Sequence, residues 1–473
     1  MDEPIDFLAD GAPPSELFGH PKGLSVLFAT EMWERFSYYG MRALLVLYMT
    51  KYLLLPGHAE QVLGLATLRR GLEALFGPLA LQPLSSQIYG FYTALVYATP
   101  ILGGLLADRV LGQRRTVIIG AVLMALGHFM MAFDHLFLVA LLALFLGSGA
   151  FKPNISTQVG GLYPQGDRRR DRAFSIFYVG INIGAFFAPL VCGTLGEGGG
   201  WHYGFAAAGV GMVIGLCIYL YGLRHLPPDA KTQTQAQAAP LASHLSGEEW
   251  RSLLVLLVLF VPSLLFWAVY EQQGNTITLW ANAEVDRSIG LFGWHTEIPT
   301  TWFLAINPFL IFAFTPLIVA LWTRQAARRR EPSSIMKMAI GCFGGALAYL
   351  VLALAAWHSG AGKASWLWLL AFFTILTLGE LYLSPVGLSL VTKLAPARML
   401  SLIMGFWLAT NFIGNFLSGW LGSFWSAMSR TSFFLTAAAI AAIAGLVILA
   451  CAGPLAKITG EITGEITSER EAG

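Results

Sequence analysis

Charged side chains are scarce in this sequence: they make up 12% of its 473 residues, whereas hydrophobic residues make up 56%. The mean hydropathy of +0.63 lies outside the range of soluble globular proteins and is typical of polytopic membrane proteins. The formal net charge of +2 is too small for a nucleic-acid-binding surface, and basic stretches interleaved with aromatic residues are missing. The composition therefore predicts a protein that lies mostly within a lipid bilayer.

Cysteines are few in the sequence, and catalytic signatures are missing from it. The chain has four cysteines without the CxxC or paired spacing of a disulfide framework or a metal site: Cys192, Cys217, Cys342 and Cys451. The sequence contains no HExxH, GxSxG or P-loop motif, so metal-dependent, hydrolytic and ATP-driven chemistry has no motif to support it. We therefore expect no cofactor, no metal and no enzymatic activity, and an ion gradient, of protons rather than Na⁺, as the source of energy.

Long hydrophobic runs are what the sequence does contain, and a membrane-spanning helix needs about 20 such residues. They predict an all-α polytopic membrane protein with spans at residues 24–54, 84–107, 115–133, 136–160, 173–195, 203–223, 251–281, 300–323, 334–357, 364–394, 399–425 and 431–453. The first 21 residues are polar and include Asp2, Glu3, Asp6 and Asp10. They lack a basic segment before a short apolar core, so we expect no cleavable signal and insertion that starts with the first span.

Basic residues gather in the loops on one side of this twelve-span arrangement. The loops follow spans two, four, six and eight, and they contain Arg109, Arg114, Arg115, Arg168, Arg169, Arg170, Arg172, Arg224, Lys231, Arg324, Arg328, Arg329 and Arg330. The short loops on the opposite side carry little positive charge, so the positive-inside rule makes the basic side cytoplasmic. Both termini are then expected in the cytoplasm.

Two segments between the spans have compositions of their own. Residues 224–250 contain Pro227, Pro228 and a run rich in Gln, Thr and Ala, which is typical of a polar linker. We therefore expect an N-terminal six-helix bundle at residues 1–223, a cytoplasmic linker at 224–250 and a C-terminal six-helix bundle with a short tail at 251–473. Apolar residues recur at helical spacing over residues 62–76 beside Arg69, Arg70 and Glu73, which predicts either an amphipathic helix at the outer interface of the membrane or an irregular apolar loop.

The most polar segment inside a predicted span covers residues 31–42, Glu-Met-Trp-Glu-Arg-Phe-Ser-Tyr-Tyr-Gly-Met-Arg. At about 100° per residue, one face of a helix would carry Glu31, Glu34, Arg35, Tyr38 and Arg42. Charge that faces lipid is costly, and charged residues in spans mostly face a bundle interior or a water-filled cavity. This stripe therefore predicts a helix that lines a polar cavity.

Four charged residues can be paired by their depth in the membrane, at a rise of about 1.5 Å per residue. Arg42 and Glu271 both fall near the outer ends of their spans, whereas Lys152 and Glu380 both fall nearer the inner ends. Each pair joins the first half of the chain to the second, as the two gates of an alternating-access protein would. A permanent structural salt bridge is the alternative, although desolvation makes buried pairs weak contributors to stability.

Lone polar residues at membrane depth complete the set of candidates. Asn182 and Asn307 lie within predicted spans, and so do the phenols of Tyr38, Tyr92 and Tyr178. An asparagine at this depth needs a hydrogen-bond partner, which a neighbouring helix or a substrate can supply. The sequence leaves these two interpretations open.

Two long segments resemble the signatures of one transporter family. Residues 31–40 resemble the ExxERFxYYG signature of the proton-dependent oligopeptide transporters of the major facilitator superfamily, and residues 177–184, Phe-Tyr-Val-Gly-Ile-Asn-Ile-Gly, resemble their FYxxINxG signature. Shorter matches cover residues 108–115, 151–154, 266–272 and 379–386. The resemblance extends over both halves of the chain. It implies the major facilitator fold, with twelve helices in two six-helix bundles, in a bacterial inner membrane.

The resemblance also implies roles for the polar residues. Proton coupling would involve Glu31, Glu34, Arg35 and Glu271. Peptide binding would involve Arg35, Tyr38, Tyr92, Lys152, Asn182, Asn307 and Glu380. Within this set Arg35 and Lys152 would face the carboxylate of a peptide, and Asn182, Asn307 and Glu380 would face its amino end. The outer gate would be Arg42 with Glu271, and the inner gate would be Lys152 with Glu380.

The chain departs from the family pattern in two places. Residues 224–250 are too polar and too short for the two extra spans of many bacterial members, and Gly90 stands where animal members have a histidine, so carboxylates are expected to bind the proton. The resulting hypothesis is a monomeric, proton-coupled symporter that imports di- and tripeptides by alternating access. The alternatives are a nitrate or other small-anion symporter on the same scaffold, a membrane peptide sensor that does not transport, and a proton-driven drug exporter.

Overall fold

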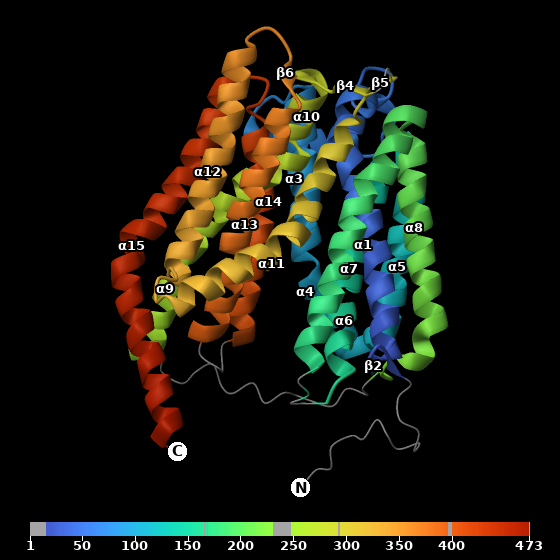
Figure 1. Ribbon diagram of the computed structural model, residues 1–473. Helices are drawn as coiled ribbons and strands as arrows, with labels where there is room; N and C mark the ends of the chain where they lie inside the picture. The colour runs from blue at the N-terminus through green and yellow to red at the C-terminus, as the bar shows by residue number, and fades with distance from the viewer. Residues whose placement is uncertain are drawn as a thin grey trace. The chain divides into compact units, whose positions relative to one another are not determined.

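The structure, a computed structural model, describes residues 16–164, 167, 169–229, 247–291, 294–395 and 400–472. The described chain is predominantly helical, and long helices run side by side within each of its parts (Figure 1). It separates into two compact units. The first unit holds the described residues up to Arg70 and those from Ala98 to Gln233, and the second holds Gly71–Tyr97 and the described residues from Thr234 onward.

The first unit is a helical bundle. Its helices are α1 (Lys22–Tyr48), α4 (Pro100–Leu106), α5 (Gln113–Met130), α6 (Phe137–Gly161), α7 (Arg169–Thr194) and α8 (Trp201–Gly222). Single π-helical turns extend three of them at η1 (Met49–Leu53), η3 (Ala107–Leu111) and η5 (Leu195–Gly199), and 3₁₀ turns lie at η2 (Ala59–Gln61), η4 (Asp134–Leu136) and η6 (Leu223–His225). Within this bundle α1 packs along α7 and α8, and α5 packs along α6 and α8.

The second unit is also a helical bundle. Its helices are α3 (Leu81–Ala98, except for the last residue), α9 (Gly247–Tyr270), α10 (Thr276–Ala283), α11 (Ile306–Ala327), α12 (Ser334–Ser359), α13 (Leu367–Leu394), α14 (Leu400–Gly422) and α15 (Arg430–Ala472). Two 3₁₀ segments belong to it, η7 (Glu271–Gly274) and η8 (Thr300–Ala305). Here α12 packs between α13 and α15, and α9 packs against α14 and α15.

Three small two-stranded sheets, which the sequence did not predict, lie at the ends of the helices. The strand β1 (Glu16–Leu17) pairs antiparallel with β2 (His20–Pro21), and β3 (Val285–Asp286) pairs in parallel with β6 (Ala364–Ser365). The third sheet is a hairpin of β4 (Ser288–Leu291) and β5 (Trp294–Glu297), with Ser288 opposite Glu297. Asp286 accepts hydrogen bonds from the hydroxyl and the backbone N–H of Ser288, which lower its pKa.

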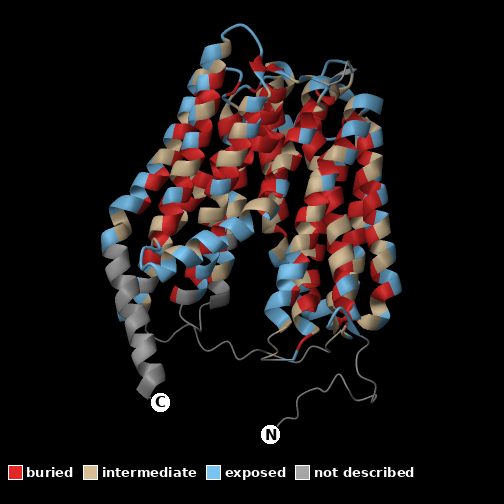
Figure 2. Ribbon diagram, in the orientation of Figure 1, coloured by how far each residue is buried: buried red, intermediate tan, exposed pale blue. Residues whose placement is uncertain are grey.

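Nine helical segments in the described part of the chain are long and apolar enough to cross a membrane. The three other predicted spans, the first, third and eleventh, are also helices in the structure, namely α1, α5 and α14. Exposed positions alternate with buried ones along the helices (Figure 2), and many exposed side chains are large and apolar, such as Leu126, Leu142, Leu254 and Leu354. Apolar side chains that face outward in this number fit a lipid environment, so the expected multi-pass membrane protein is confirmed.

Two predicted spans are interrupted. The predicted span at 84–107 divides at Thr99 into α3 and α4, with Pro100 in the first turn of α4, where its missing N–H costs nothing. The predicted span at 251–281 ends as an α-helix at Tyr270 and continues through η7 and Asn275 into α10. Residues 65–76 form the helix α2 (Leu65–Phe76), so the prediction of an irregular loop is wrong for this segment. The position of this helix at the membrane surface stays a prediction. Of the predicted linker and basic loops, residues 230–246 and Arg168 lie outside the described residues.

The start of the predicted linker is held on the first unit by Arg114, which belongs to the segment 108–115. The Arg114 side chain donates hydrogen bonds to the carbonyl oxygens of Leu226 and Pro227, and its backbone N–H donates to Asp229 Oδ1 at 2.8 Å. Gly112 has a φ of 79°, which favours glycine, and the Asp229 carboxylate fills the place that a Cβ would take there. This part of the chain after α8 is therefore packed against the turn between η3 and α5.

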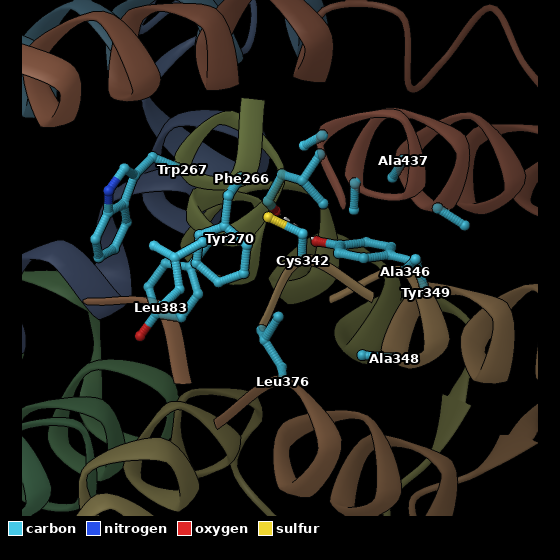
Figure 3. Close-up of a cluster of buried hydrophobic side chains, with 14 of the residues drawn as sticks. Phe266, Trp267, Tyr270, Cys342, Ala346, Ala348, Tyr349, Leu376, Leu383 and Ala437 are labelled. Atoms are coloured by element: carbon cyan, nitrogen blue, oxygen red, sulfur yellow. Dashed lines mark hydrogen bonds between the residues drawn. The ribbon is translucent and has the colours of Figure 1, made fainter. Parts of the chain in front are cut away.

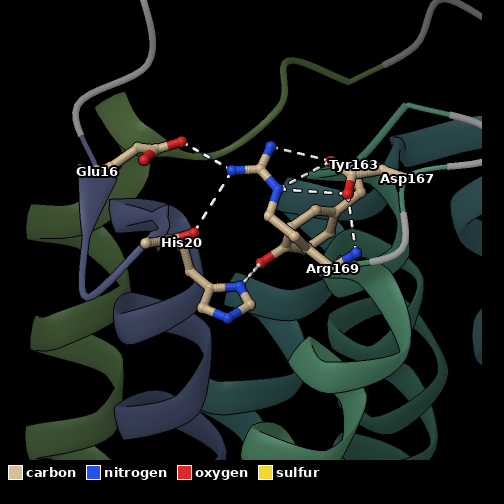
Figure 4. Close-up of polar contacts among 6 residues, drawn as sticks. Glu16, His20, Tyr163, Asp167 and Arg169 are labelled. Atoms are coloured by element: carbon tan, nitrogen blue, oxygen red, sulfur yellow. Dashed lines mark hydrogen bonds and ion pairs between the residues drawn. The ribbon is translucent and has the colours of Figure 1, made fainter.

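A polar cluster fastens the hairpin before α1 to the loop between α6 and α7 (Figure 4). Arg169 pairs with Asp167 at 2.9 Å and with Glu16 at 2.8 Å, and His20 Nδ1 lies 2.8 Å from the hydroxyl of Tyr163. Hydrogen bonds from Arg169 lower the pKa of Asp167, whereas burial raises the pKa of Tyr163 to about 12. The cluster holds the first turn of α1 in place, and α1 carries the charged stripe.

Candidate functional site

The charged stripe of α1 forms a compact buried triad in the first unit. Arg35 Nε lies 3.1 Å from Oε1 of Glu31 and donates a hydrogen bond to Oε2 of Glu34. All three side chains are at most 3% exposed. Glu31 Oε2, Glu34 Oε1 and one terminal nitrogen of Arg35 have no hydrogen-bond partner among the described residues. A buried triad with unused acceptors and an unused donor can bind a proton or a polar ligand.

Lys152 of α6 joins this triad across the bundle. Its ammonium group lies 5.8 Å from the ring centre of Tyr38, and the guanidinium of Arg35 lies 5.3 Å from the same ring. Lys152 also interacts electrostatically with Glu31, Glu34 and Arg42. The structure therefore brings Glu31, Glu34, Arg35 and Lys152 into one charge cluster, in which Arg35 pairs with both carboxylates and Lys152 interacts electrostatically with them.

Glycines in the two family signatures allow α1 and α7 to pack closely beside this cluster. A Cβ on Gly184 would lie 2.2 Å from the carbonyl oxygen of Met32 and 2.9 Å from Cβ of Arg35. A Cβ on Gly40 would lie 2.5 Å from Sγ of Cys192 on α7. Because neither position has room for a side chain, the two signatures are two sides of one helix contact that sets the position of Arg35.

Asn182 and Tyr92 occupy different environments. The amide of Asn182 donates to the carbonyl oxygen of Tyr178 at 3.0 Å, one turn earlier in α7, so this hydrogen bond lies within its own helix. Tyr92 is buried on α3, which groups with the second unit, whereas Tyr38 belongs to the first. The expected contacts of Asn182, Tyr92 and Tyr38 with a peptide remain predictions.

A second polar cluster surrounds Glu380 in the second unit. Glu380 Oε2 accepts hydrogen bonds of 2.8 Å from the hydroxyl of Tyr270 and from the amide of Asn307. The Asn307 amide also donates to the hydroxyl of Thr377 at 2.9 Å. These residues come from three helices, α9, α11 and α13. One carboxylate oxygen is thus held by two donors, which fixes the orientation of the Glu380 carboxylate.

Aromatic packing holds Tyr270 in this position (Figure 3). Its ring stacks on Phe266 at 5.8 Å and meets Trp267 edge to face at 5.1 Å. The buried side chains of Leu376 and Leu383 belong to the same core. The direction of the Tyr270 hydroxyl is therefore set by a large apolar core, with little freedom to rotate away from Glu380.

Glu271 lies immediately beyond Tyr270, at the point where α9 gives way to the 3₁₀ segment η7. Its side chain is 3% exposed and interacts electrostatically with Glu380, Tyr270 and Tyr349. A carboxylate placed where a helix breaks lies beside backbone that can change conformation more readily than a continuous helix. This position is consistent with a residue that responds to a proton or to a moving partner.

The sequence reasoning missed two of the residues around Glu380. Thr377 lies one helical turn before Glu380 on α13, so the i, i+3 spacing was an available signal. Tyr270 was part of a matched segment but was assigned no role, because the sequence does not reveal that it contacts a residue 110 positions away. The two predicted gates each join the first unit to the second, and they remain predictions.

Comparison with known proteins identifies the family. The sequence model of the POT family matches residues 114–243 and 230–438. The di-/tripeptide transporter of Lactococcus lactis subsp. cremoris is 35% identical over 94% of this chain and 98% of its own length. The peptide transporter YePEPT of Yersinia enterocolitica is 35% identical over 86% of this chain and 88% of its own length.

Solved structures agree with this assignment. A peptide transporter POT in complex with alafosfalin is 32% identical with a TM-score of 0.83, over 95% of this chain and 98% of that chain. A POT family transporter in complex with 5-aminolevulinic acid is 30% identical with a TM-score of 0.80, over 94% and 99% of the two chains. Sequence and fold therefore confirm the resemblance seen in residues 31–40 and 177–184, and the chain belongs to the POT family of transporters.

Proposed function

We propose that this protein is a proton-coupled symporter that imports di- and tripeptides by alternating access. The observation that carries the proposal is the pair of buried clusters, one cationic at Arg35 and Lys152 and one anionic at Glu380. Every short peptide has a carboxylate and an ammonium group at its ends, whatever its side chains. Two clusters of opposite charge can bind these constant groups and tolerate many side chains between them.

The charge cluster of the first unit supplies a reason for coupling to protons. Glu31 and Glu34 share Arg35, so a peptide carboxylate that approaches Arg35 competes with two carboxylates for one guanidinium. A proton on either glutamate removes one competitor and leaves donor capacity for the peptide. Binding of a proton and binding of a peptide carboxylate therefore favour each other, which is the requirement for symport.

The remaining roles follow from this scheme. Arg42 with Glu271 forms the outer gate and Lys152 with Glu380 the inner gate, while Tyr38, Tyr92, Asn182 and Asn307 contact the peptide. Protonation of Glu271 releases Arg42. The protein works as a monomer in a bacterial inner membrane with both termini in the cytoplasm, and two six-helix bundles at residues 1–223 and 251–473 rock around the central site. The chemistry is transport without covalent change, as for its relatives that are named transporters.

Uptake of labelled dialanine into proteoliposomes tests the proposal. We expect accumulation under an inward proton gradient, competition by unlabelled dipeptides and no competition by nitrate. Competition by nitrate would point instead to a small-anion symporter, and peptide binding without counterflow would point to a sensor. Efflux driven by the same gradient would indicate an exporter.

Glu271→Gln tests the coupling role separately. The amide keeps the size of the side chain but can no longer exchange a proton, so gradient-driven accumulation should be lost while counterflow of dialanine continues. Counterflow needs only the exchange of bound peptide and no net proton movement. Full gradient-driven accumulation by the variant would refute the role of Glu271.

A further inference from the structure

Four arginines gather where α11 ends and the loop to α12 begins. The helix ends at Ala327, Arg324 lies in its last turn, and Arg328, Arg329 and Arg330 follow it directly. All four side chains are exposed. Among the described residues, no carboxylate forms an ion pair with any of them. Like charges repel one another unless an anion lies near, so this group is suited to an anionic partner.

The loop between α11 and α12 has one carboxylate, Glu331, and it pairs with a different cation. This partner is Nζ of Lys337 in α12, which also lies 3.9 Å from the ring centre of Trp322 in α11. The same ring meets Tyr382 of α13 edge to face at 5.3 Å. The end of α11 is thus held by both neighbouring helices, and the charge of Glu331 is directed to Lys337 rather than to the arginines.

The turn that follows α11 holds an arginine where a glycine is usual. The backbone N–H of Arg330 donates to the carbonyl oxygen of Gln325 at 2.9 Å, and that of Arg329 donates to Ala326 at 2.9 Å. This is the Schellman pattern of a helix C-terminus, in which the residue after the cap is left-handed and usually glycine. Here that residue is Arg329, with a φ of 49°. Because a side chain is strained in this conformation, its presence points to a role other than closing the turn.

Two of the arginines continue an exposed apolar stripe of α11. At about 100° per residue, one face of the helix carries Leu317, Leu321, Arg324 and Arg328. The two leucines are 64% and 43% exposed. At a rise of about 1.5 Å per residue, Arg324 lies about 4.5 Å and Arg328 about 10 Å beyond Leu321 along the helix. A headgroup layer is roughly 5–8 Å thick, so this face passes from apolar to basic over about the depth of one such layer.

We propose that the end of α11 is a binding site for the headgroup of an anionic phospholipid. We call it the α11 arginine site; its residues are Arg324, Arg328, Arg329 and Arg330. A guanidinium group donates paired hydrogen bonds to phosphate oxygens, and the exposed leucines of the same face lie along the acyl chains. This apolar continuation favours a lipid over a soluble anion. In the proposed orientation the site faces the cytoplasmic leaflet, where basic groups beside a span attract anionic lipids.

The loop between α6 and α7 provides a matched control. It is also basic, but its arginines are mixed with acids: Arg169 pairs with Asp167, and Asp171 stands between Arg170 and Arg172. The side chains of Arg170 and Arg172 are exposed, like those of the α11 arginine site. A general attraction between basic loops and an anionic membrane surface would act on both loops. A binding site at the end of α11 would distinguish them.

Native mass spectrometry of the full-length protein in detergent tests the proposal, with phosphatidylglycerol and phosphatidylcholine of the same acyl chains as probes. Arg324→Gln with Arg328→Gln should weaken phosphatidylglycerol binding by at least about tenfold and leave phosphatidylcholine binding unchanged. Arg170→Gln with Arg172→Gln should stay within about twofold of the parent. An equal loss in both variants, or no loss in the first, would overturn the proposal. Displacement of phosphatidylglycerol by inorganic phosphate would also overturn it, because the site would then bind a soluble anion.

Arg329→Gly provides a second test if the glutamine variant does not yield folded protein. Glycine suits the left-handed turn better than arginine, so the Tm measured without lipid should rise. Phosphatidylglycerol binding should nevertheless become several times weaker, because one cation of the site is lost. A higher Tm with unchanged phosphatidylglycerol binding would overturn the proposal. Dialanine binding should match the parent in this variant, which separates the lipid site from the proposed transport function.

Discussion

The hydroxyl of Tyr270 offers a sharp test of how the anionic cluster binds an ammonium group. It donates to Oε2 of Glu380 at 2.8 Å, and the Asn307 amide donates to the same oxygen at 2.8 Å. Tyr270→Phe removes one donor and keeps the aromatic ring in its place against Phe266 and Trp267. The substitution therefore changes the orientation of the carboxylate without opening a cavity in the core.

The size of the effect follows from the bond that is lost. A hydrogen bond to a charged group contributes about 1.5–3 kcal/mol. Glu380 is half-buried and keeps its bond from Asn307, so the lower end of this range applies. Since about 1.4 kcal/mol corresponds to a tenfold change in affinity, Tyr270→Phe should raise the Kd for dialanine about tenfold.

Binding measured on solubilised protein, together with initial rates of uptake into proteoliposomes, checks this value. Tyr349→Phe is the matched control, because it removes the same group from the same core. The Tyr349 hydroxyl donates to the carbonyl oxygen of Val269 at 2.7 Å and not to Glu380. The control should lower the Tm and leave the Kd unchanged. A Kd within about twofold of the parent in Tyr270→Phe, or an equal rise in both variants, would contradict the reasoning.

Two further predictions concern the first unit. Gly184→Ala should destabilise the protein by about 1–3 kcal/mol, because the added methyl group has no room against α1. Gly104→Ala is the control, because a Cβ at Gly104 meets open space and should not destabilise the protein. Thermal unfolding in detergent measures both variants, and equal Tm values would contradict the packing argument. Hydrogen bonds from Arg169 lower the pKa of Asp167 in the folded protein. The ionised carboxylate therefore stabilises the folded state at pH values above the ordinary pKa of aspartate, and this stabilisation is lost as the pH falls through the lowered pKa of the folded state. The Tm difference between the parent and Asp167→Asn should therefore be present at neutral pH and shrink below about pH 4, and a difference independent of pH would refute the assignment.

The helices show where sequence reasoning succeeds and where it stops. In the described residues each of the twelve predicted spans is mostly helical, because a run of about 20 apolar residues satisfies its backbone hydrogen bonds in a bilayer as a helix. The interruptions at Thr99 and after Tyr270 were not predicted, although Pro100, Gly274 and Asn275 were visible as local signals. Hydropathy averages over such residues, whereas neighbouring helices determine whether the chain bends there.

The polar cluster around Arg35 and the one around Glu380 also differ in how far the sequence predicts their contacts. Residues four positions apart share one face of a helix, so the contact between Glu31 and Arg35 could be predicted from their spacing alone. The contacts of Glu380 with Tyr270 and Asn307 span 110 and 73 residues of sequence, and no local pattern encodes them. Gly40 and Gly184 lie within the two signatures, but only the packing of α1 against α7 shows that neither position has room for a side chain.

By itself the sequence determined that the protein is a polytopic helical membrane protein, that a charged stripe lies on its first long helix and that its signatures resemble those of a peptide transporter family. These properties depend on composition and on spacings of a few residues, which the chain carries whatever its tertiary structure. Only the tertiary structure decided which distant helices supply the donors around Glu380, and that α3 packs glycine to glycine against α14. Such contacts form when helices far apart in the chain pack together, so their geometry depends on the whole bundle rather than on any one segment.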